Sequence, residues 1–178
     1  AHQHANLAAA VAGVRHMREH MGWEVPDEAI VQGAEEACLL GRLQVLSPAQ
    51  AARVLLHCEA PAGGPPTIVV LDGAHTRASG AALAAALRAA LPDAEVAVVA
   101  AMADDKDHGG FAAEVSELRP RAVVATQSAI AGSKMRCLPP GVLKAQWEAA
   151  SRHLPTPGAG VQEAEGMAEA IAMAVAAV

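Results

Sequence analysis

The sequence is poor in aromatic residues. They make up 2% of its 178 residues and are Phe111, Trp23 and Trp147. Proteins that bind single-stranded nucleic acid stack successive bases on aromatic side chains. A chain with so few rings is therefore a poor candidate for that kind of binding.

The sequence also lacks a basic stripe. Its 13 Lys and Arg residues are outnumbered by 19 Asp and Glu residues, and the formal net charge is −6. Binding to nucleic acid or to an anionic membrane depends on clustered positive charge. We therefore expect neither nucleic acid nor a membrane among the partners of this protein.

Cysteines are few and far apart. The three cysteines, Cys38, Cys58 and Cys137, lack the spacing of a metal site, and their number is odd. We expect free thiols in a reducing compartment. The alanine-rich stretch 168–178 is too short to span a membrane.

The sequence begins with Ala1, inside a helical pattern, and shows no signal-peptide pattern. We therefore expect a piece of a longer polypeptide. Its compartment, cytoplasmic or mitochondrial, is left open because we expect the natural N-terminus to lie upstream of Ala1.

What the sequence does contain is apolar residues, which make up 53% of the total and are largely alanine. That content supports a full core and argues against disorder. Short apolar runs at 67–71, 95–101 and 121–126 predict strands, because they are too short for helices. Helical patterns cover 78–91, 108–118, 139–151 and 163–178. Continuous apolar strands are covered on both faces, so we expect an α/β fold with a doubly wound, mostly parallel sheet.

A helical hairpin is expected before this α/β pattern. Its first helix covers 2–21 and ends at Gly22, and its second runs from Pro26 to about Cys38. We expect this hairpin to be the tail of a preceding domain. The alternation at 42–46 suits a half-exposed strand, and 52–58 is compatible with either helix or strand.

The most informative stretch is 67–79, TIVVLDGAHTRAS. Asp72 and His75 lie on the turn that leaves the C-terminal end of a predicted strand, which is the edge where open α/β sheets bind ligands. Gly73 permits close approach of a ligand or a sharp turn. The helix that follows is expected to offer free N–H groups to an anion. The alternative is an ordinary strand-to-helix turn in which Asp72 only caps the backbone.

Other charged residues also lie at the ends of predicted strands. The segment 102–108, MADDKDH, follows the second strand, and the loop 127–136 after the third carries two cations at its end. Both are also compatible with solvated turns, in which Asp107 caps the next helix. Arg42 precedes a strand and is either a surface residue or a clamp for phosphate oxygens. The sequence contains neither a G-x-x-x-x-G-K-[ST] phosphate loop nor a G-x-G-x-x-G fingerprint.

Five modest motifs follow one another along the chain. They are H-Q-x-x-N at 2–6, L-L-G-R-L-Q-V-L at 39–46, V-L-D-G-A-H-T at 70–76, M-A-D-D-K-D-H at 102–108 and I-A-G-S-K-M-R at 130–136. This series resembles the C-terminal part of folylpolyglutamate synthase and dihydrofolate synthase, members of the Mur ligase superfamily. The D-K-D-H and A-G-x-K-x-R forms are most similar to the plant and algal dihydrofolate synthase branch. The resemblance spans nearly the whole chain, and the five motifs in this order make it specific.

The resemblance implies a division of the chain. Residues 1–38 look like the last helices of the central ATPase domain, and 41–178 look like the C-terminal Rossmann-like domain, which packs on that ATPase domain. The phosphate loop, the Mg²⁺ ligands and the folate pocket of the family lie mostly upstream. By the same resemblance, we expect the final strand of the family to be missing after Val178.

The resemblance also implies a reaction. Such enzymes use ATP to convert a folate or dihydropteroate carboxylate into an acyl phosphate, which the amino group of L-glutamate attacks. That chemistry depends on charge stabilisation and positioning. The fragment alone is expected to be inactive.

Individual residues take roles from the same resemblance. Asn6 and Arg42 would contact ATP, with Arg42 at the phosphates, and Asp72 would accept hydrogen bonds from the ribose hydroxyls. His75 would lie near the phosphates or the incoming glutamate, as the catalytic candidate. Lys106 and Lys134 are weaker candidates for binding glutamate.

The chain departs from the family pattern after His75. Thr76 stands where many members have asparagine, and it still offers a donor and an acceptor. Arg77 stands where proline is usual, which predicts a less rigid turn.

Two other readings of the sequence stay open. Because this polypeptide lacks a phosphate loop, it is also compatible with a non-catalytic binding or assembly module. A Mur-type ligase with a different amino acid acceptor is the other alternative. The sequence does not distinguish dihydrofolate synthase from folylpolyglutamate synthase or a bifunctional enzyme.

Overall fold

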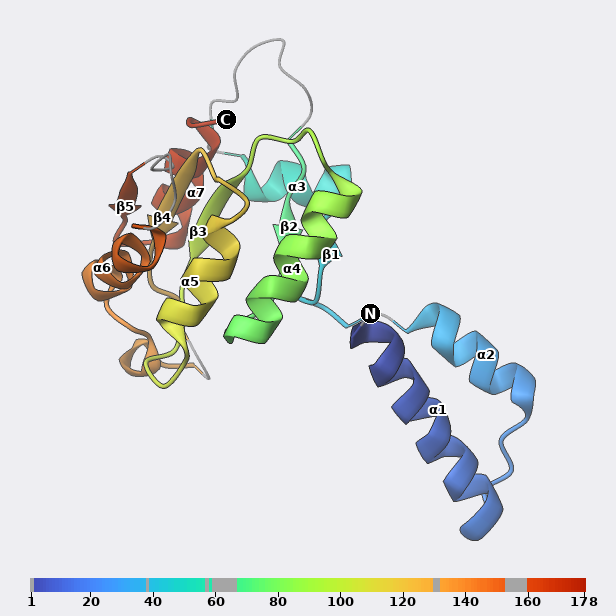
Figure 1. Cartoon of the computed structure of the whole chain (residues 1–178). Coiled ribbons are helices and arrows are strands. Elements are labelled where there is room, and N and C mark those ends of the chain that lie inside the picture. The colour runs from blue at the N-terminus through green and yellow to red at the C-terminus, as the bar shows by residue number, and fades with distance from the viewer. Residues whose placement is uncertain (1, 38, 57, 59–66, 130–131, 153–159) are drawn as a thin grey trace. The chain divides into compact units, whose positions relative to one another are not determined.

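The structure is a computed structural model that describes residues 2–37, 39–56, 58, 67–129, 132–152 and 160–178 (Figure 1). The chain divides into two compact units, Ala1–Leu40 and Gly41–Val178. We describe each unit by itself. Within the described residues, no helix has the length and apolar character needed to cross a membrane.

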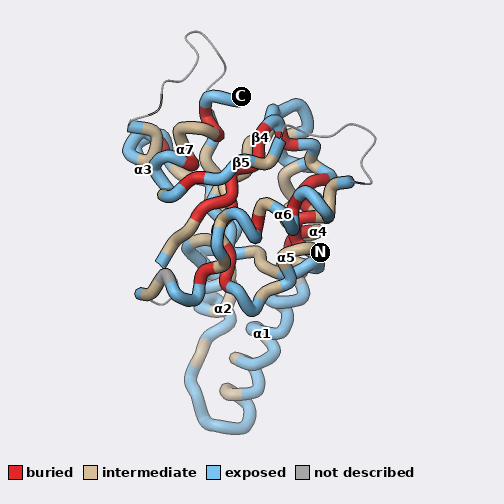
Figure 2. Tube along the Cα trace, turned by 90° about the vertical axis from the view of Figure 1, so that its left-hand side faces the viewer, coloured by how far each residue is buried: buried red, intermediate tan, exposed pale blue. Residues whose placement is uncertain are grey.

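The first unit is the predicted helical hairpin. It consists of α1 (His2–His20) and α2 (Asp27–Glu36), and Gly22 after α1 has a left-handed φ of 71°. The guanidinium of Arg18 joins the helices by donating to the Val25 carbonyl at 3.2 Å and to the Asp27 carboxylate at 2.7 Å. None of residues 5–37 is buried, and α1 and α2 are pale blue and tan in Figure 2. The hairpin therefore has no core of its own.

The second unit contains a small antiparallel sheet followed by a parallel one. Its first elements are β1 (Gln44–Val45), α3 (Pro48–Val54), β2 (Val70–Leu71) and α4 (Arg77–Ala90). They are followed by β3 (Ala97–Ala100), α5 (His108–Ser116), β4 (Ala122–Ala125), the 3-10 helix η1 (Lys134–Arg136), α6 (Pro140–Ser151), β5 (Val161–Glu163) and α7 (Met167–Val175).

The parallel sheet has the order β3-β4-β5 and is covered on both faces. Side chains alternate across a strand, so β4 contributes to two separate clusters. Val123 and Ala125 pack with a cluster on α5 and α6 that includes Trp147, whereas Val124 packs with Ala170 of α7 and its neighbours. This arrangement confirms the predicted doubly wound α/β fold.

The prediction for 67–71 was wrong in one respect. Of this run only β2 is a strand, and it pairs antiparallel with β1, with Val45 opposite Val70. The Leu46 N–H extends the pairing by donating to the Val69 carbonyl at 2.9 Å. β2 is therefore hydrogen-bonded to β1 rather than to the parallel sheet.

The C-terminal prediction was also wrong in part. A single helix was expected over 163–178, but β5 occupies Val161–Glu163 and α7 begins only at Met167. The three residues of β5 include a single large apolar side chain, so they lack the continuous apolar run of β3 and β4. The ambiguous stretch 52–58 is helical up to Val54, where α3 ends.

The expectation of free thiols is confirmed for the described cysteines, whereas the reducing compartment stays a prediction. Cys58 and Cys137 are free thiols, and Cys137 is buried. Cys38 lies outside the described residues.

Candidate functional site

The predicted site is built where the loop before β1 meets the turn after β2. The Leu43 N–H donates to Oδ2 of Asp72 at 2.6 Å, and the Gly73 N–H donates to the Gly41 carbonyl at 2.7 Å. Gly41 in turn donates its N–H to the Gln44 side chain at 2.9 Å. These bonds bring the segments of Arg42 and Asp72, two predicted nucleotide contacts, side by side.

Both carboxylate oxygens of Asp72 accept backbone hydrogen bonds. Oδ1 accepts from the Ala74 N–H at 2.7 Å, and Oδ2 accepts from the Leu43 N–H. Asp72 therefore does cap backbone N–H groups, as the alternative interpretation of this turn predicted. Each oxygen of an ionised carboxylate can accept a second hydrogen bond. Since Asp72 is exposed, it can also accept from a ligand, and its contact with a ribose stays a prediction.

Arg42 lies across Gly73. A Cβ at position 73 would be 3.3 Å from Nη1 of Arg42 and 3.5 Å from its Cζ, which explains why glycine suits this turn. Arg42 is exposed, and among the described residues it forms no ion pair. Its guanidinium therefore has donors free to bind an anionic ligand.

His75 is held by its own turn. Its Nδ1 lies 2.8 Å from the Gly73 carbonyl oxygen. Because a carbonyl only accepts hydrogen bonds, Nδ1 carries the proton in this contact. In the neutral ring Nε2 then keeps its lone pair. The half-buried imidazole can thus act as an acceptor toward a ligand, and as a donor when it is charged.

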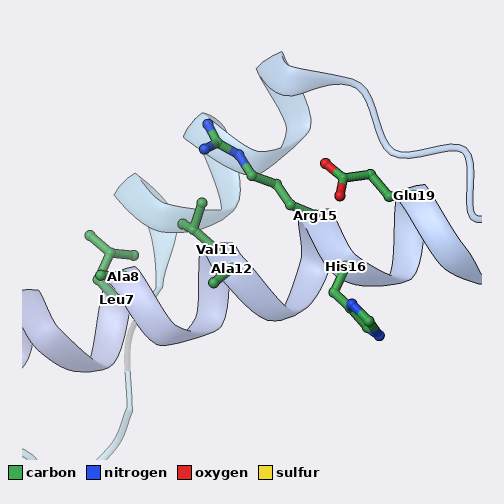
Figure 3. Close-up of a pocket in the computed structure, with 7 residues that line it drawn as sticks. All are labelled: Leu7, Ala8, Val11, Ala12, Arg15, His16 and Glu19. Atoms are coloured by element: carbon green, nitrogen blue, oxygen red, sulfur yellow. The ribbon is translucent and has the colours of Figure 1, made fainter.

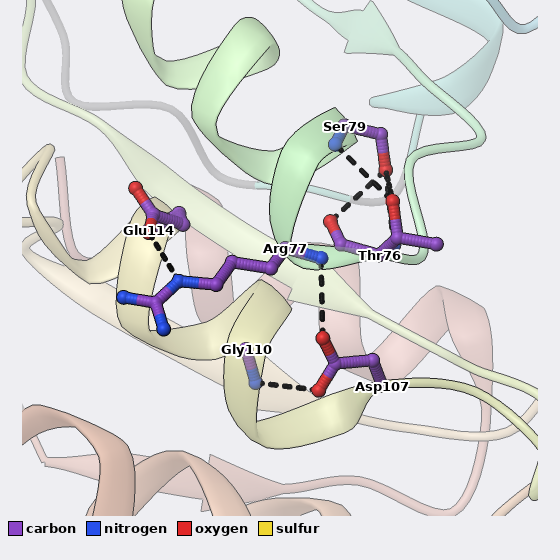
Figure 4. A network of polar contacts seen from close by, with 6 residues as sticks. All are labelled: Thr76, Arg77, Ser79, Asp107, Gly110 and Glu114. Atoms are coloured by element: carbon purple, nitrogen blue, oxygen red, sulfur yellow. Dashed lines mark hydrogen bonds and ion pairs between the residues drawn. The ribbon is translucent and has the colours of Figure 1, made fainter.

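The start of α4 corrects the expectation of free N–H groups. Thr76 is the N-cap and forms a capping box with Ser79, whose N–H donates to the Thr76 hydroxyl at 3.2 Å (Figure 4). The N–H of Arg77, the first residue of α4, donates to Oδ2 of Asp107 at 3.3 Å. Side chains of the protein itself therefore occupy two of the donors that were expected to face an anion.

The same carboxylate begins α5, as predicted for Asp107. Its Oδ1 accepts from the Gly110 N–H at 2.9 Å. Arg77 adds a second link between the helices, because its Nε donates to Oε1 of Glu114 at 2.8 Å. This hydrogen bond and the charge of Glu114 raise the pKa of Arg77. Position 77, expected to leave the turn less rigid, instead joins α4 to α5.

Lys106 lies in the turn between β3 and α5. Its ammonium pairs with the neighbouring carboxylate of Asp105 at 3.0 Å, and this hydrogen bond lowers the pKa of Asp105. The turn is bound to the segment around η1, because the Asp104 N–H donates to the Arg136 carbonyl at 3.0 Å. Ala103 and Cys137 form an antiparallel bridge beside that bond. The backbones of the two lysine-bearing loops therefore lie together.

The remaining predicted residues are less well placed. Lys134 belongs to η1, but its side chain lies outside what the structure describes. Asn6 is an exposed residue of α1, in the first unit. The roles of Asn6 and Lys134 stay predictions. Within the described residues there is no group of three or more His, Cys, Asp or Glu side chains that could hold a metal ion.

A hollow in the first unit does not belong to this site. It measures about 670 Å³ and follows one face of α1, lined by Leu7, Ala8, Val11, Ala12, Arg15, His16 and Glu19 (Figure 3). None of the predicted site residues lines it. Its apolar stripe is the side of a helix that lacks a core, so we do not assign it chemistry.

Several site residues were missed by sequence reasoning. Thr76 directly before the alanine-rich helix is itself an N-cap signal, but Ser79 stands where the sequence signature of a capping box has Glu or Gln. The Arg77–Glu114 pair has a separation of 37 positions, and the Leu43 contact uses a backbone donor, so neither leaves a local signal in the sequence.

A comparison with protein families matches residues 41–178 to the family described as Mur ligase, glutamate ligase domain. A comparison with curated protein sequences found no match.

Solved structures share the fold of the chain. FolC of E. coli in complex with DHPP and ADP aligns with a TM-score of 0.67 and 23% identity, over 96% of this chain and 32% of that one. Folylpolyglutamate synthase of Mycobacterium tuberculosis complexed with ADP aligns with a TM-score of 0.63 and 23% identity, over 88% and 29%. The bifunctional folylpolyglutamate synthase/dihydrofolate synthase of Yersinia pestis, complexed with AMPPNP and Mn, gives 0.57 and 25%, over 88% and 30%. The chain thus spans about a third of the length of these proteins.

Proposed function

The chain belongs to the family of the Mur ligase glutamate ligase domain, and from this membership we propose that it is the C-terminal part of an ATP-dependent ligase. The ligase would join L-glutamate to the carboxylate of a folate or dihydropteroate. The observation that carries the proposal is the pairing of the Arg42 loop with the Asp72 turn at the end of β2. Three similar structures whose names include folylpolyglutamate synthase or FolC were solved with ADP or AMPPNP, which supports the same class of substrate.

The roles follow from the chemistry of each group. The guanidinium of Arg42 binds phosphate oxygens of ATP, while the remaining lone pairs of Asp72 accept from the ribose hydroxyls. Nε2 of His75 faces the phosphates or the incoming glutamate. Lys106 and Lys134 bind the carboxylates of glutamate, and Asn6 contributes to the nucleotide contact.

A preceding ATPase domain would complete this enzyme. The hairpin has no buried residue among positions 5–37, yet it exposes Met21, Trp23 and Val31 by 62%, 53% and 57%. Covering apolar side chains that are otherwise exposed to water is energetically favourable. Packing of the hairpin on its own ATPase domain would cover them, and that domain would supply the phosphate cradle and the ligands of Mg²⁺.

The proposal is tested in the enzyme that includes the ATPase domain. Arg42→Ala and Asp72→Ala are compared with Arg53→Ala, which removes an exposed arginine of α3. The measurement is ATP-dependent incorporation of glutamate into folate or dihydropteroate. We expect a large loss of rate for the first two variants and none for the third. Unchanged rates for both site variants would refute the site.

The isolated chain is expected to show no ATP hydrolysis and weak nucleotide binding. A few contacts cannot replace the groups that hold a triphosphate. Hydrolysis above that of an Asp72→Ala control would contradict this expectation.

The alternative, a binding or assembly module without catalysis, makes a different prediction about the native protein. The intact mass of the polypeptide from its source would then be near the 18.0 kDa of this sequence. A ligase would have a much larger mass.

A further inference from the structure

One carboxylate begins two helices. Asp107 accepts from the Gly110 N–H in the first turn of its own helix, α5, at 2.9 Å, and from the N–H of Arg77, the first residue of α4, at 3.3 Å (Figure 4). The two donors lie in elements that follow different strands. Asp107 therefore caps α5, as its position predicts, and in addition accepts a hydrogen bond from the start of α4.

Two further contacts hold the same pair of helices together. Arg77 reaches Glu114 of α5 at 2.8 Å. Gly80 lies so close to α5 that an added Cβ would be 3.2 Å from a ring carbon of Phe111 and 3.3 Å from its carbonyl oxygen. The first turns of α4 are thus joined to α5 at successive points.

The start of α4 in turn holds the backbone of His75. The N–H groups of His75 and Thr76 both donate to the Ser79 hydroxyl, at 3.1 and 2.9 Å. Ser79 belongs to the first turn of α4, which Asp107 holds through Arg77. Asp107 is therefore connected to the backbone of His75 by hydrogen bonds at Arg77 and at Ser79, with the first turn of α4 joining these two residues.

We propose that Asp107 is a positioning residue that fixes the turn of His75 against the turn of Lys106. The proposal rests on the proposed function, since it assigns a role within that site. It also gives the start of α4 an internal anion. The positive end of a helix favours a negative charge, and here the protein supplies it. A nucleotide phosphate is then bound by side chains such as Arg42, not by the first N–H of α4.

Position 77 offers a selective test, because proline has no N–H and suits the first position of a helix. Arg77→Pro removes the donor to Asp107 together with the Glu114 pair. Arg77→Ala keeps the donor and removes only the pair. The difference between these two variants isolates the hydrogen bond to Asp107.

Position 107 offers a second test. An asparagine side chain has one oxygen that accepts and one nitrogen that only donates. Asp107→Asn can therefore keep the cap on Gly110 but cannot serve both donors in the observed arrangement. If Asp107 were only the cap of α5, this variant would behave like the unchanged protein at His75.

Two adjacent glycines give a third, matched test. A Cβ at Gly110 would overlap the carboxylate of Asp107, whereas a Cβ at Gly109 would meet only the Gln146 amide oxygen, at an ordinary 3.8 Å. Gly110→Ala should displace the carboxylate, and Gly109→Ala should leave it in place.

The experiment is NMR spectroscopy of the whole chain without nucleotide. It records hydrogen exchange of the Arg77 and Gly110 amides and the signals of the His75 imidazole. In Asp107→Asn we expect exchange at Arg77 to rise about tenfold, while Gly110 keeps its protection. The His75 signals should move in Asp107→Asn, Arg77→Pro and Gly110→Ala, and stay in place in Arg77→Ala and Gly109→Ala.

His75 signals that are unchanged in both Asp107→Asn and Arg77→Pro would overturn the proposal. Asp107→Asn keeps an acceptor for the first turn of α5, and proline suits the first position of α4. The test therefore does not depend on Asp107→Ala, which removes the cap of α5 together with the acceptor for Arg77 and can unfold the start of α5. Because no nucleotide is present, the result is independent of the ligase assignment. An inactive ligase with the expected NMR shifts would refute the proposed function alone.

Discussion

Asp72 and Leu43, 29 positions apart in the sequence, are joined by a hydrogen bond of 2.6 Å from the Leu43 N–H to the carboxylate. Leu43 has a φ of 45°, in the left-handed region that a residue with a branched side chain seldom adopts. The bond therefore holds a strained residue directly after Arg42. Asp72 therefore supports the position of Arg42, and it is also a candidate for binding the nucleotide itself.

Replacing Asp72 with alanine should therefore destabilise the second unit as well as the site. The variant leaves the Leu43 and Ala74 N–H groups without their acceptor, and we expect a loss of about 1 kcal/mol in the free energy of unfolding. Urea unfolding measures it. Asp93→Ala, at an exposed turn residue, is the control, and equal stability of the two variants would contradict the role of the hydrogen bond.

Gly73→Ala should separate stability from function. The added Cβ meets the mobile end of Arg42 at 3.3 Å, so the guanidinium can move aside and the fold should lose less than about 1 kcal/mol. The displaced guanidinium should nevertheless raise the KM for ATP about tenfold in the enzyme with its ATPase domain. Gly160→Ala, where a Cβ meets nothing within 4 Å, is the control. An unchanged KM in the first variant would show that Arg42 does not bind the nucleotide.

The hairpin should become less stable in acid. The hydrogen bond and charge of Arg18 lower the pKa of Asp27, so the charged carboxylate is favoured in the folded hairpin. This contribution is present at neutral pH and is lost as the pH falls below about 4, through the lowered pKa. Amide NMR signals of α2 between neutral and acid pH measure the effect. Asp27→Asn should abolish this pH dependence, and a variant that keeps it would exclude the pair as its source.

Leu143→Ala should strongly destabilise the second unit. The side chain is 0% exposed and belongs to the same core cluster as Trp147. The ring of Trp147 packs edge to face on that of Phe111, with the ring centroids 5.8 Å apart. Truncating a buried leucine leaves a cavity and costs about 3 kcal/mol. Denaturant unfolding followed by tryptophan fluorescence measures it.

The adjacent Val142 provides the control for that experiment. It is 46% exposed, so Val142→Ala should cost less than about 1 kcal/mol. A Trp23→Phe background leaves Trp147 as the reporter. Equal losses for the two variants would mean that this face of α6 is not part of the core.

The parallel core was predictable because β3 and β4 share the same apolar sequence, A-V-V-A, which a strand buried on both faces requires. β5 was not predictable in this way. Its sequence, V-Q-E, is compatible with the start of a helix, and only its pairing with β4 makes it a strand. The pairing of β2 with β1 was missed for a related reason, since an apolar run does not reveal which neighbour it will bond to.

The site shows a similar division. Arg42, Asp72 and His75 could be selected because their side chains have distinctive chemistry in motifs that follow a known order. The contacts that hold them come from backbone N–H groups of Leu43, Ala74 and Arg77, which every residue except proline carries. Such donors have no signature in a single sequence, so they had to be found in the structure.

The link between Arg77 and Glu114 also has an evolutionary consequence. A homologue with proline at position 77 has neither the N–H that reaches Asp107 nor a cation for Glu114. Selection on an acidic residue at position 114 would then be relaxed, while Asp107 would still be needed to cap its own helix. Positions 77 and 114 should therefore covary among related proteins. Position 107 should stay the same whichever residue stands at position 77.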